Sequence, residues 1–308
     1  MLTRRRFVAI SAAMAASSWA GATHARPAAR LWTGQALGAR ASIRLDHPQA
    51  ETIAARVLAE IDRLENILSL YRADSALSRL NRDGRLEAPS FELLECLSTA
   101  SAVHAASGGR FDPTVQPLWA LWAEAAMAGK RPSEAAIEQA RRRVGWNKVR
   151  MDSRGITLER GMSLTLNGVG QGYVADRVAA LLEAEGLNDI LIDTGEFRAI
   201  GGQPEGGGWP VRLESGADLA LRQRALATSS SLGTTFDQAG RDGHILDPVT
   251  GRPAATVWRS VSITAPSAAI ADALSTASCL MPEEKSIVRL MEKFTEARCE
   301  AAFPVMDI

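Results

Sequence analysis

Residues 209–227, WPVRLESGADLALRQRALA, decide the fold class of this chain. Apolar residues alternate with polar ones on either side of the turn-forming triplet Gly216-Ala217-Asp218, a pattern typical of antiparallel strands. Strands joined by so short a turn have no crossover helix between them. The stretch therefore indicates an antiparallel sheet rather than a doubly wound parallel one.

Helices and strands surround this stretch without regular alternation. On its N-terminal side we expect helices at residues 51–71, 90–107, 132–143 and 173–185, and strands at 149–151, 156–158 and 190–193. On its C-terminal side we expect a strand at 260–264, helices at 268–281 and 283–294, and a closing strand at 301–305. This mixture predicts the α+β class, with mixed or antiparallel sheets flanked by helices.

The composition is that of an ordinary globular protein. With 308 residues, 46% of them apolar, the chain is long enough for one large domain or two modest ones, and the lack of a repeat or long linker in the sequence favours one. Lys plus Arg and Asp plus Glu each number 35, so no overall charge draws the protein to nucleic acid. The three cysteines form no C-x-x-C pair and the four histidines are scattered, which argues against a disulfide framework and a zinc site.

The first 25 residues have the pattern of an export signal. The run TRRRF at residues 3–7 precedes an Ala-rich apolar stretch at 8–20 and a small-residue cleavage site ending at Ala25, which indicates the twin-arginine pathway and a periplasmic protein. An amphipathic surface helix is the alternative, but it rarely places three adjacent arginines before an uncharged run. The stretch is shorter and less apolar than the roughly 20 residues of a membrane span, so we expect no stable insertion after the signal is removed.

Two segments place an aromatic side chain beside an acid at a turn. Tyr71 stands at a helix end, close to Asp74, which we expect to cap the following turn. Phe111 follows the helix-ending pair Gly108-Gly109 and precedes Asp112; we expect its ring to be exposed and able to cover a planar ligand. Taken singly, Tyr71 reads better as a boundary core residue, and Asp112 with the next proline as a plain turn.

A third segment, LNGVGQGY at residues 166–173, is a glycine-rich loop that opens a helix. A backbone without Cβ atoms can approach phosphate oxygens closely, and the free N–H groups of a first helical turn point at an anion. The spacing is G-x-G-x-G rather than G-x-G-x-x-G, so we reject a Rossmann fingerprint. A tight structural turn explains the loop nearly as well.

The fourth and fifth segments carry groups suited to proton transfer and metal binding. The fourth segment consists of ATSSS at 227–231 and HILDPVTG at 244–251. A histidine such as His244, with an ordinary pKa of about 6.5, can exchange a proton at neutral pH. A lone histidine, however, is usually structural. In the fifth, ADALST at 271–276, Asp272 and Thr276 lie one helical turn apart and share a face, so both can reach one hard cation such as Mg²⁺. Alone, the acid would more simply stabilise the helix N-terminus.

Together and in this order, the segments resemble the ApbE family of FAD:protein FMN transferases, over roughly residues 31–305. The matching motifs are Tyr71 with Asp74-Ser75, Gly-x-Phe-Asp-x-Thr, the glycine loop, Ala-Thr-Ser, His-Ile-Leu-Asp-Pro-x-Thr-Gly and Ala-Asp-Ala-x-x-Thr. The resemblance implies a T-fold-like domain at residues 26–308 that transfers FMN from FAD to a Thr or Ser hydroxyl of an acceptor flavoprotein and releases AMP.

The resemblance also implies roles for single residues. FAD would lie in a cleft, with contacts from Leu37, Tyr71, Arg110, Phe111, Asp112, Thr165, Gln171, Thr228 and the backbone at Leu246. Mg²⁺ would grip the pyrophosphate, held by Asp272, Thr276 and the carbonyl of Gly168. His244 would act as the base on the attacking hydroxyl, oriented by Asp247, or would only bond the pyrophosphate.

Three positions depart from the family pattern. Gln171 stands where Lys or Glu is usual, Thr165 where Asp is often found, and Leu37-Gly38-Ala39 where Met-Gly-Thr is common. The glycine loop, with DTGE at residues 193–196, is most similar to the NosX subgroup, which implies a membrane-bound, NosR-like acceptor serving nitrous-oxide reductase. The charges lost at Thr165 and Gln171 keep one rival open, a periplasmic protein that binds and delivers FAD without transfer. A third reading is a metal-dependent FAD pyrophosphatase, with water in place of the acceptor hydroxyl.

Overall fold

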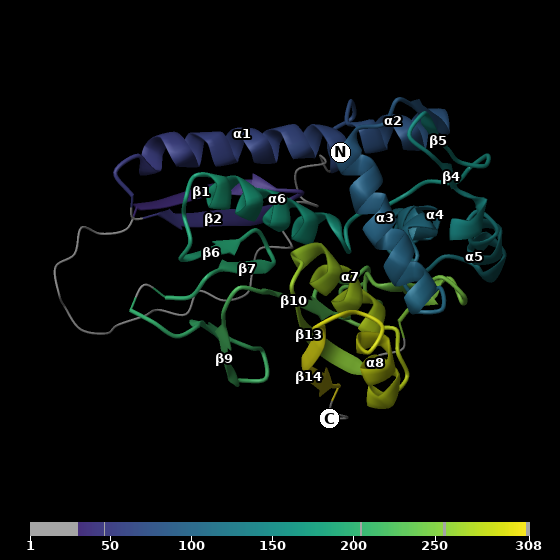
Figure 1. The fold of residues 1–308 in the computed structure, drawn as a ribbon. Coiled ribbons are helices and arrows are strands. Elements are labelled where there is room, and N and C mark those ends of the chain that lie inside the picture. Colours follow the sequence, from purple (N-terminus) through teal and green to yellow (C-terminus); the bar gives the residue numbers. More distant parts are fainter. Residues whose placement is uncertain (1–29, 46, 204, 255–256, 306–308) are drawn as a thin grey trace.

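The computed structural model describes residues 30–45, 47–203, 205–254 and 257–305. The expected export signal at residues 1–25 lies outside these ranges and stays a prediction. Within them, no helix combines the length and the apolar character that crossing a membrane requires. The chain folds around one central sheet with helices packed beside it (Figure 1).

In the described part of the chain, seven strands form the central sheet, and every neighbouring pair is antiparallel. In spatial order they are β1 (Arg30–Ala36), β2 (Ala39–Leu45), β6 (Ile190–Asp193), β7 (Phe197–Ile200), β10 (Ala225–Ser230), β13 (Trp258–Ala265) and β14 (Arg298–Pro304). Helices that cover such a sheet without alternating with its strands define the α+β class. The predicted fold class is therefore confirmed.

The stretch at residues 209–227 contains the expected hairpin. Strand β8 (Trp209–Arg212) pairs antiparallel with β9 (Asp218–Leu221), and Arg212 stands opposite Asp218 across the turn. The hairpin forms a small sheet of its own rather than extending the central one. Its apolar side chains share a cluster with Leu226 of β10, so burial rather than strand pairing attaches the hairpin to the domain.

Four helices build the layers over the sheet. Helix α7 (Ala268–Ser278) packs on β10 and β13, and α6 (Gly170–Ala184) packs on β6 and β7. Helix α1 (Ala50–Leu68) covers α6, and α3 (Phe91–Ala106) packs on α7 (Figure 1). The N-termini of α6 and α7 thereby meet near the middle of the molecule.

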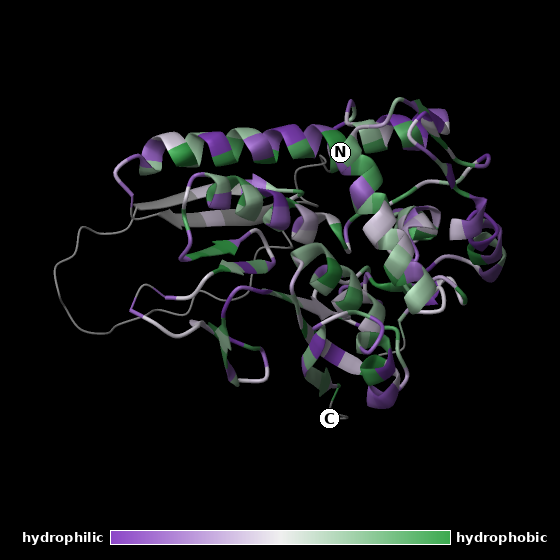
Figure 2. Cartoon of the chain, viewed as in Figure 1, coloured by the Kyte–Doolittle hydropathy of each residue, from purple (hydrophilic) through white to green (hydrophobic). Residues whose placement is uncertain are grey.

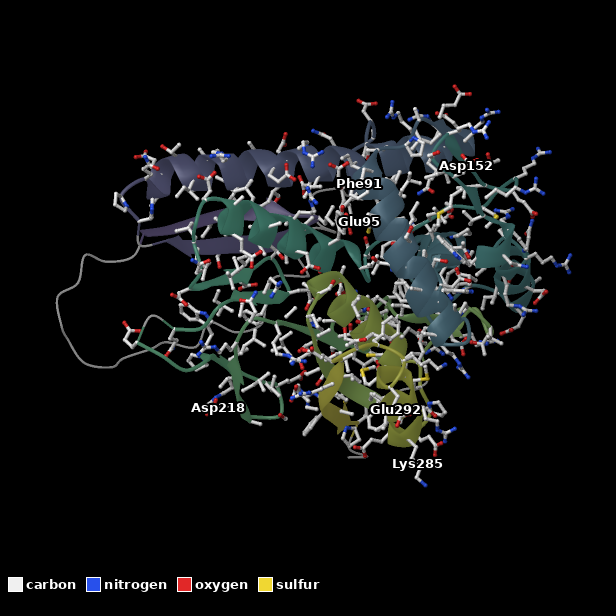
Figure 3. The ribbon with its side chains drawn as sticks, in the orientation of Figure 1. Phe91, Glu95, Asp152, Asp218, Lys285 and Glu292 are labelled. Atoms are coloured by element: carbon white, nitrogen blue, oxygen red, sulfur yellow. The ribbon has the colours of Figure 1, made fainter. Side chains whose placement is uncertain are left out.

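Helix α1 shows how the sequence pattern fixes this packing. Figure 2 shows hydrophobic and hydrophilic bands alternating along it, as expected for a helix with one buried face. The buried positions include those predicted from the periodicity, Ile53, Val57, Ile61, Leu64 and Leu68. A polar contact joins the next layer: Tyr173 of α6 donates a hydrogen bond of 2.6 Å to Glu95 of α3, labelled in Figure 3.

The remaining elements lie mostly beyond α3. A three-stranded sheet in the order β3-β5-β4 and two short helices stand at that end of the molecule (Figure 1). The bounds are α2 (Ala76–Asp83), β3 (Arg85–Glu87), α4 (Gln116–Met127), α5 (Glu134–Arg141), β4 (Arg150–Met151), β5 (Gly155–Thr157), β11 (Leu246–Asp247), β12 (Arg252–Pro253) and α8 (Glu284–Met291), with 3₁₀ turns at Pro113–Val115 and Trp146–Lys148.

Two helices were not expected, and one predicted cap is wrong. Helix α2 has one apolar face but only eight residues, too few to show a repeating period, and α4 follows a proline-containing turn and is apolar on most sides. The N-cap of α2 is Ser75, whose Oγ accepts the Ser78 N–H at 3.0 Å, and not Asp74, whose side chain is exposed. Ser75 directly precedes the helix and can therefore reach its third N–H group.

Candidate functional site

The glycine loop lies at the start of α6 and is in contact with several other elements. A Cβ added at Gly172 would lie 2.2 Å from the carbonyl oxygen of Ala268, so only glycine lets α6 approach the N-terminus of α7 this closely. A Cβ at Gly170 would lie 2.7 Å from the Leu37 side chain. Two of the three glycines thus serve contact between protein segments, in addition to any approach of a ligand.

Gly168 is the glycine nearest to the expected metal residues. A Cβ at this position would lie 3.0 Å from Thr276 Oγ1 and 3.1 Å from Cε2 of Phe111. Gly168 therefore lies next to the hydroxyl of Thr276, and metal binding by its carbonyl stays a prediction. Phe111 is only 6% exposed, so the expectation of an exposed ring is wrong; the ring backs the glycine loop instead.

Asp272 is a buried carboxylate on the same face of α7. It is 3% exposed, and its Oδ2 accepts the N–H of Gly172 at 3.2 Å. Burial raises the pKa of Asp272 to about 7, against the smaller opposing effect of that hydrogen bond. The charged form of this side chain is thus poorly solvated, and a cation beside it would be stabilised strongly.

Glu196 is a second buried carboxylate that the sequence did not single out. Burial and the nearby Asp272 hold its pKa well above the usual range, although the N–H of Thr228 donates to its Oε2 at 3.3 Å. It follows β6 in the DTGE run, and its closeness to Asp272 arises from the packing of α7 on the sheet. Two carboxylates in one low-dielectric region repel each other when both are ionised, so a cation bound between them would be stabilised further.

Hydroxyl groups complete this part of the site. Ser229 of β10 lies 3.1 Å from Thr276 Oγ1 and 2.7 Å from Ser275 Oγ, and Ser275 in turn donates to the Asp272 carbonyl at 2.9 Å. The exposed Thr228 is held through Ser262 at 2.8 Å. The Ala-Thr-Ser motif thus lies against the predicted metal residues, as a shared site requires.

The donor set is compatible with a hard cation. The described residues contain no group of three or more His, Cys, Asp or Glu side chains arranged to hold a metal ion. The set is instead one carboxylate, one hydroxyl and the backbone at Gly168, which are oxygen donors of the kind that Mg²⁺ accepts while keeping waters and phosphate oxygens as its other ligands. The residues therefore fit Mg²⁺ and disfavour Zn²⁺.

The turn between β1 and β2 brings two more predicted residues to the glycine loop. Leu37 adopts a φ of +50° and its N–H donates to Glu65 Oε1 at 2.9 Å, which fixes the turn against α1. A Cβ at Gly38 would lie 3.2 Å from the ring of Tyr71. Tyr71 is 61% exposed, so its ring is available to a ligand at this edge.

The segment from Arg110 to Asp112 serves the frame of the site. The Oδ1 of Asp112 accepts the backbone N–H and the hydroxyl of Thr114 at 2.8 and 2.6 Å, and the residue is 7% exposed. Thr165 N–H donates to the Pro113 carbonyl at 2.8 Å, which attaches the entry of the glycine loop to this turn. Asp112 therefore acts as a turn-forming cap, and its direct contact with a ligand stays a prediction.

His244 lies on a separate loop, and its partner differs from the one expected. Its Nδ1 is 3.0 Å from the carbonyl oxygen of Thr234, so Nδ1 carries the proton and Nε2 keeps a lone pair. Burial lowers the pKa of His244, which keeps the ring neutral at pH 7. Asp247 instead accepts the Val249 N–H at 2.7 Å, so the prediction that it orients His244 is corrected: Thr234 does so.

Arg110 connects the histidine segment to the chain that follows α7. Arg110 Nη1 lies 3.4 Å from Asp247 Oδ2 and equally far from the Leu280 carbonyl just after α7. Leu246 itself is 4% exposed and its side chain packs in the cluster with Trp122, so the ligand contact through its backbone stays a prediction. Gln171, in the first turn of α6, is partly exposed and accepts the Thr194 hydroxyl through its carbonyl at 3.3 Å.

The fold and the site together define an α+β protein that presents oxygen donors for a hard cation beside a glycine loop, an arrangement suited to a ligand with phosphate groups. The chain belongs to the ApbE family, whose model matches residues 37–303.

Individual relatives agree with this assignment. The chain is 30% identical over 263 residues to a Klebsiella pneumoniae protein named FAD:protein FMN transferase, covering 79% of this chain and 75% of that one. It is 29% identical over 287 residues to the Salmonella typhimurium protein of the same name, covering 86% and 82%. The solved apo structure of the Pseudomonas stutzeri flavinyl transferase ApbE has a TM-score of 0.75 at 29% identity, covering 86% of this chain and 88% of that one.

Proposed function

We propose that this protein transfers FMN from FAD to a Thr or Ser hydroxyl of an acceptor flavoprotein in a Mg²⁺-dependent reaction. The hydroxyl oxygen forms a bond to the phosphorus of the FMN half, the pyrophosphate bridge breaks, and AMP leaves with the bridging oxygen. Family membership supports the activity. The observation that carries the metal requirement is the buried Asp272 carboxylate, one helical turn from Thr276, whose pKa is raised by burial and lowered only by its hydrogen bond from the Gly172 N–H.

Each group has a distinct part in this proposal. Asp272, Thr276 and the Gly168 carbonyl would hold Mg²⁺, which, when bound, supplies positive charge to the pyrophosphate oxygens. The Nε2 lone pair of His244 accepts the proton of the attacking hydroxyl, because the Thr234 carbonyl fixes the proton on Nδ1. A lowered pKa keeps that lone pair free at neutral pH.

The flavin contacts follow from exposure. Tyr71 is the exposed aromatic at the edge of the site and is our candidate to cover the isoalloxazine ring. Leu37 and Thr165 border the glycine loop and Gln171 lies within it, and Thr228 is an exposed residue whose N–H donates to Glu196. All the predicted ligand contacts remain part of this proposal. The observed contacts of Phe111 and Asp112 are with the protein: Phe111 packs against the glycine loop, and Asp112 holds the turn to which the entry of that loop is attached.

The acceptor and the location are also proposed. The NGVGQGY loop with the downstream DTGE run supports a NosX-like protein acting on a membrane-bound, NosR-like flavoprotein of nitrous-oxide reductase maturation. The TRRRF run supports export by the twin-arginine pathway, removal of residues 1–25 and action of the domain at 26–308 in the periplasm.

Mass spectrometry tests the transfer directly. The mature protein is incubated with FAD, MgCl₂ and the soluble flavin-accepting domain of a NosR-like protein, and we expect the FMN mass on one acceptor Thr or Ser together with free AMP. FMN and AMP without labelled acceptor would mean hydrolysis, and unchanged FAD would mean binding alone; either result contradicts the proposal.

Two histidine variants isolate the base. His244→Gln should lower the transfer rate by roughly 10²- to 10⁴-fold while FAD still binds, because general-base catalysis contributes that much. His47→Gln, at the turn before α1, is the matched control and should leave the rate unchanged. A His244→Gln variant with the parent rate would remove the base assignment.

A further inference from the structure

The loop that carries His244 is one closed hairpin, residues 234–244. Thr235 and Gly243 form an antiparallel bridge, and Phe236 N–H donates to the Asp242 carbonyl at 2.7 Å. At its base, the His244 N–H donates to the Thr234 carbonyl at 3.0 Å. The same carbonyl accepts the ring Nδ1 at 3.0 Å. The orientation of the imidazole therefore depends on the closure of this hairpin.

The tip of the hairpin is organised by Asp237. Its Oδ1 accepts the N–H groups of Arg241 and Asp242, each at 2.8 Å. These hydrogen bonds lower the pKa of Asp237, so it is an anion at neutral pH. Asp242 is a second carboxylate in the same short loop and is only 8% exposed. Asp237 is paired with Arg241 of the same hairpin at 3.5 Å, so Asp242 is the carboxylate of this loop that needs a cation from outside the hairpin.

Arg131 supplies that cation from a different part of the chain. It lies between α4 and α5, and its Nε and Nη2 donate to Asp242 Oδ2 and Oδ1 at 2.5 and 2.8 Å. This two-pronged contact is directional, and its carboxylate is shielded from solvent although the Arg131 side chain is 59% exposed. It connects the hairpin to the end of α4, so that the loop does not depend on its own hydrogen bonds alone.

An aromatic contact attaches the hairpin to the same helix. The ring of Phe236 lies 5.7 Å from that of Trp119 and 5.9 Å from that of Trp122, both on α4. Trp122 Nε1 also donates to the Gly251 carbonyl at 2.9 Å, beyond the histidine. Helix α4 thus holds the chain on both sides of His244, and Arg131 adds the only charged contact described between α4–α5 and the hairpin.

We propose that Arg131 is a positioning residue: by clamping Asp242, it keeps the hairpin closed and thereby holds the imidazole of His244 in the tautomer and direction that the transfer needs. Its effect on the rate rests on the proposed function, whereas its effect on the ring does not. Without Arg131, the carboxylate of Asp242, a residue that is only 8% exposed, loses the cation that both its oxygens contact, the hairpin opens more often, and Nδ1 loses its acceptor at Thr234.

Nitrogen NMR of the histidine rings tests the structural part. In the full-length protein labelled with ¹⁵N-histidine, Arg131→Gln should convert His244 from one Nδ1-protonated tautomer to a mixture of tautomers. Arg212→Gln is the matched control, because Arg212 forms the same two-pronged pair with Asp218 (labelled in Figure 3) at the end of the remote β8–β9 hairpin, and it should leave the His244 signals unchanged.

Two further variants keep the test decisive. Arg131→Lys should restore part of the single-tautomer signal, because lysine keeps the positive charge but cannot donate two parallel hydrogen bonds to the Asp242 carboxylate. If Arg131→Gln does not fold, Asp242→Asn replaces it and should show the same mixture of tautomers. A single, unchanged His244 tautomer in a folded Arg131→Gln or Asp242→Asn variant would overturn the proposal.

Kinetics separate this proposal from the proposed function. With a working acceptor, Arg131→Gln should lower kcat roughly tenfold with little change in KM for FAD, since misplacing a base slows the reaction more than binding. An unchanged kcat in the folded variant would also overturn the positioning role. If the parent protein shows no transfer at all, the proposed function fails, and the NMR result still decides whether Arg131 positions the ring.

Discussion

Replacing Asp272 with Asn should make the metal-free protein more stable and should remove the stabilisation that Mg²⁺ gives the parent. The amide oxygen of Asn can still accept the Gly172 N–H that Asp272 accepts at 3.2 Å. The change therefore keeps the shape and the hydrogen bond and removes only the negative charge. Because that charge is 97% shielded from solvent and faces Glu196, its removal relieves an unfavourable interaction in the folded state.

The pKa of Asp272 gives the size and the pH range of the effect. Its value rises from 3.8 in the unfolded chain to about 7 in the folded protein. Since each tenfold change in proton affinity is about 1.4 kcal/mol, full ionisation costs up to roughly 4 kcal/mol of folding free energy. A raised folded-state pKa means that this stability is present below about pH 4 and is lost as the pH rises to about 7. Asp272→Asn should therefore match the parent at pH 4 and exceed it at pH 8.

Urea denaturation followed by circular dichroism measures this directly. At pH 8 in EDTA, Asp272→Asn should unfold at a higher urea concentration than the parent. Its free energy of unfolding should be larger by up to roughly 4 kcal/mol. In MgCl₂ at about 100 times the dissociation constant, the parent should gain about 2.7 kcal/mol and the Asn variant almost none. A variant that is less stable than the parent in EDTA, or that gains as much from MgCl₂, would refute the reasoning.

A second carboxylate provides the control. Asp176 accepts hydrogen bonds from Ser267 Oγ and from the Ala268 and Ala269 N–H groups at 2.7, 2.9 and 3.0 Å, which caps α7. Asp176→Asn places an amide N–H against these donors and should destabilise the protein by roughly 1–2 kcal/mol. The loss should be the same in EDTA and in MgCl₂, which distinguishes a structural carboxylate from one that binds the metal.

Three other substitutions give separate checks. Thr276→Val keeps the shape and removes the hydroxyl, so calorimetry should show Mg²⁺ affinity about tenfold lower or more, with little change in Tm. Gly172→Ala would put a Cβ 2.2 Å from the Ala268 carbonyl oxygen and should cost roughly 3 kcal/mol in denaturant unfolding. Ser75→Ala should cost about 1 kcal/mol through loss of the α2 cap, whereas the exposed Asp74→Ala should stay within about 0.5 kcal/mol.

Features set by neighbours in the sequence were predictable. The shared face of Asp272 and Thr276 follows from helical periodicity, and both contact the glycine loop, Asp272 at Gly172 and Thr276 at Gly168. The β8–β9 hairpin follows from alternation around a turn. The buried face of α1 follows from its apolar period. In each case, the information lies within one or two turns of chain.

Features set by contacts between distant segments were not predictable. The proximity of Glu196 to Asp272 exists because α7 packs across the sheet, and no spacing in the sequence records it. The burial of Phe111 depends on the glycine loop that reaches it from elsewhere. Asp247 stands three residues from His244, but the chain turns its carboxylate to the Val249 N–H, so closeness in sequence misled the assignment of the orienting group.

The backbone contact between Gly172 and Ala268 has a consequence for ligand binding. Because α6 and α7 meet with no side chain between them, the relative placement of Gly168, Asp272 and Thr276 is set by the packing of the two helices during folding. Little conformational entropy then remains to be lost when a cation and a nucleotide arrive. Binding then loses little free energy to ordering of the site. A change that loosens the contact between α6 and α7 should therefore weaken affinity even if every ligating atom is still present.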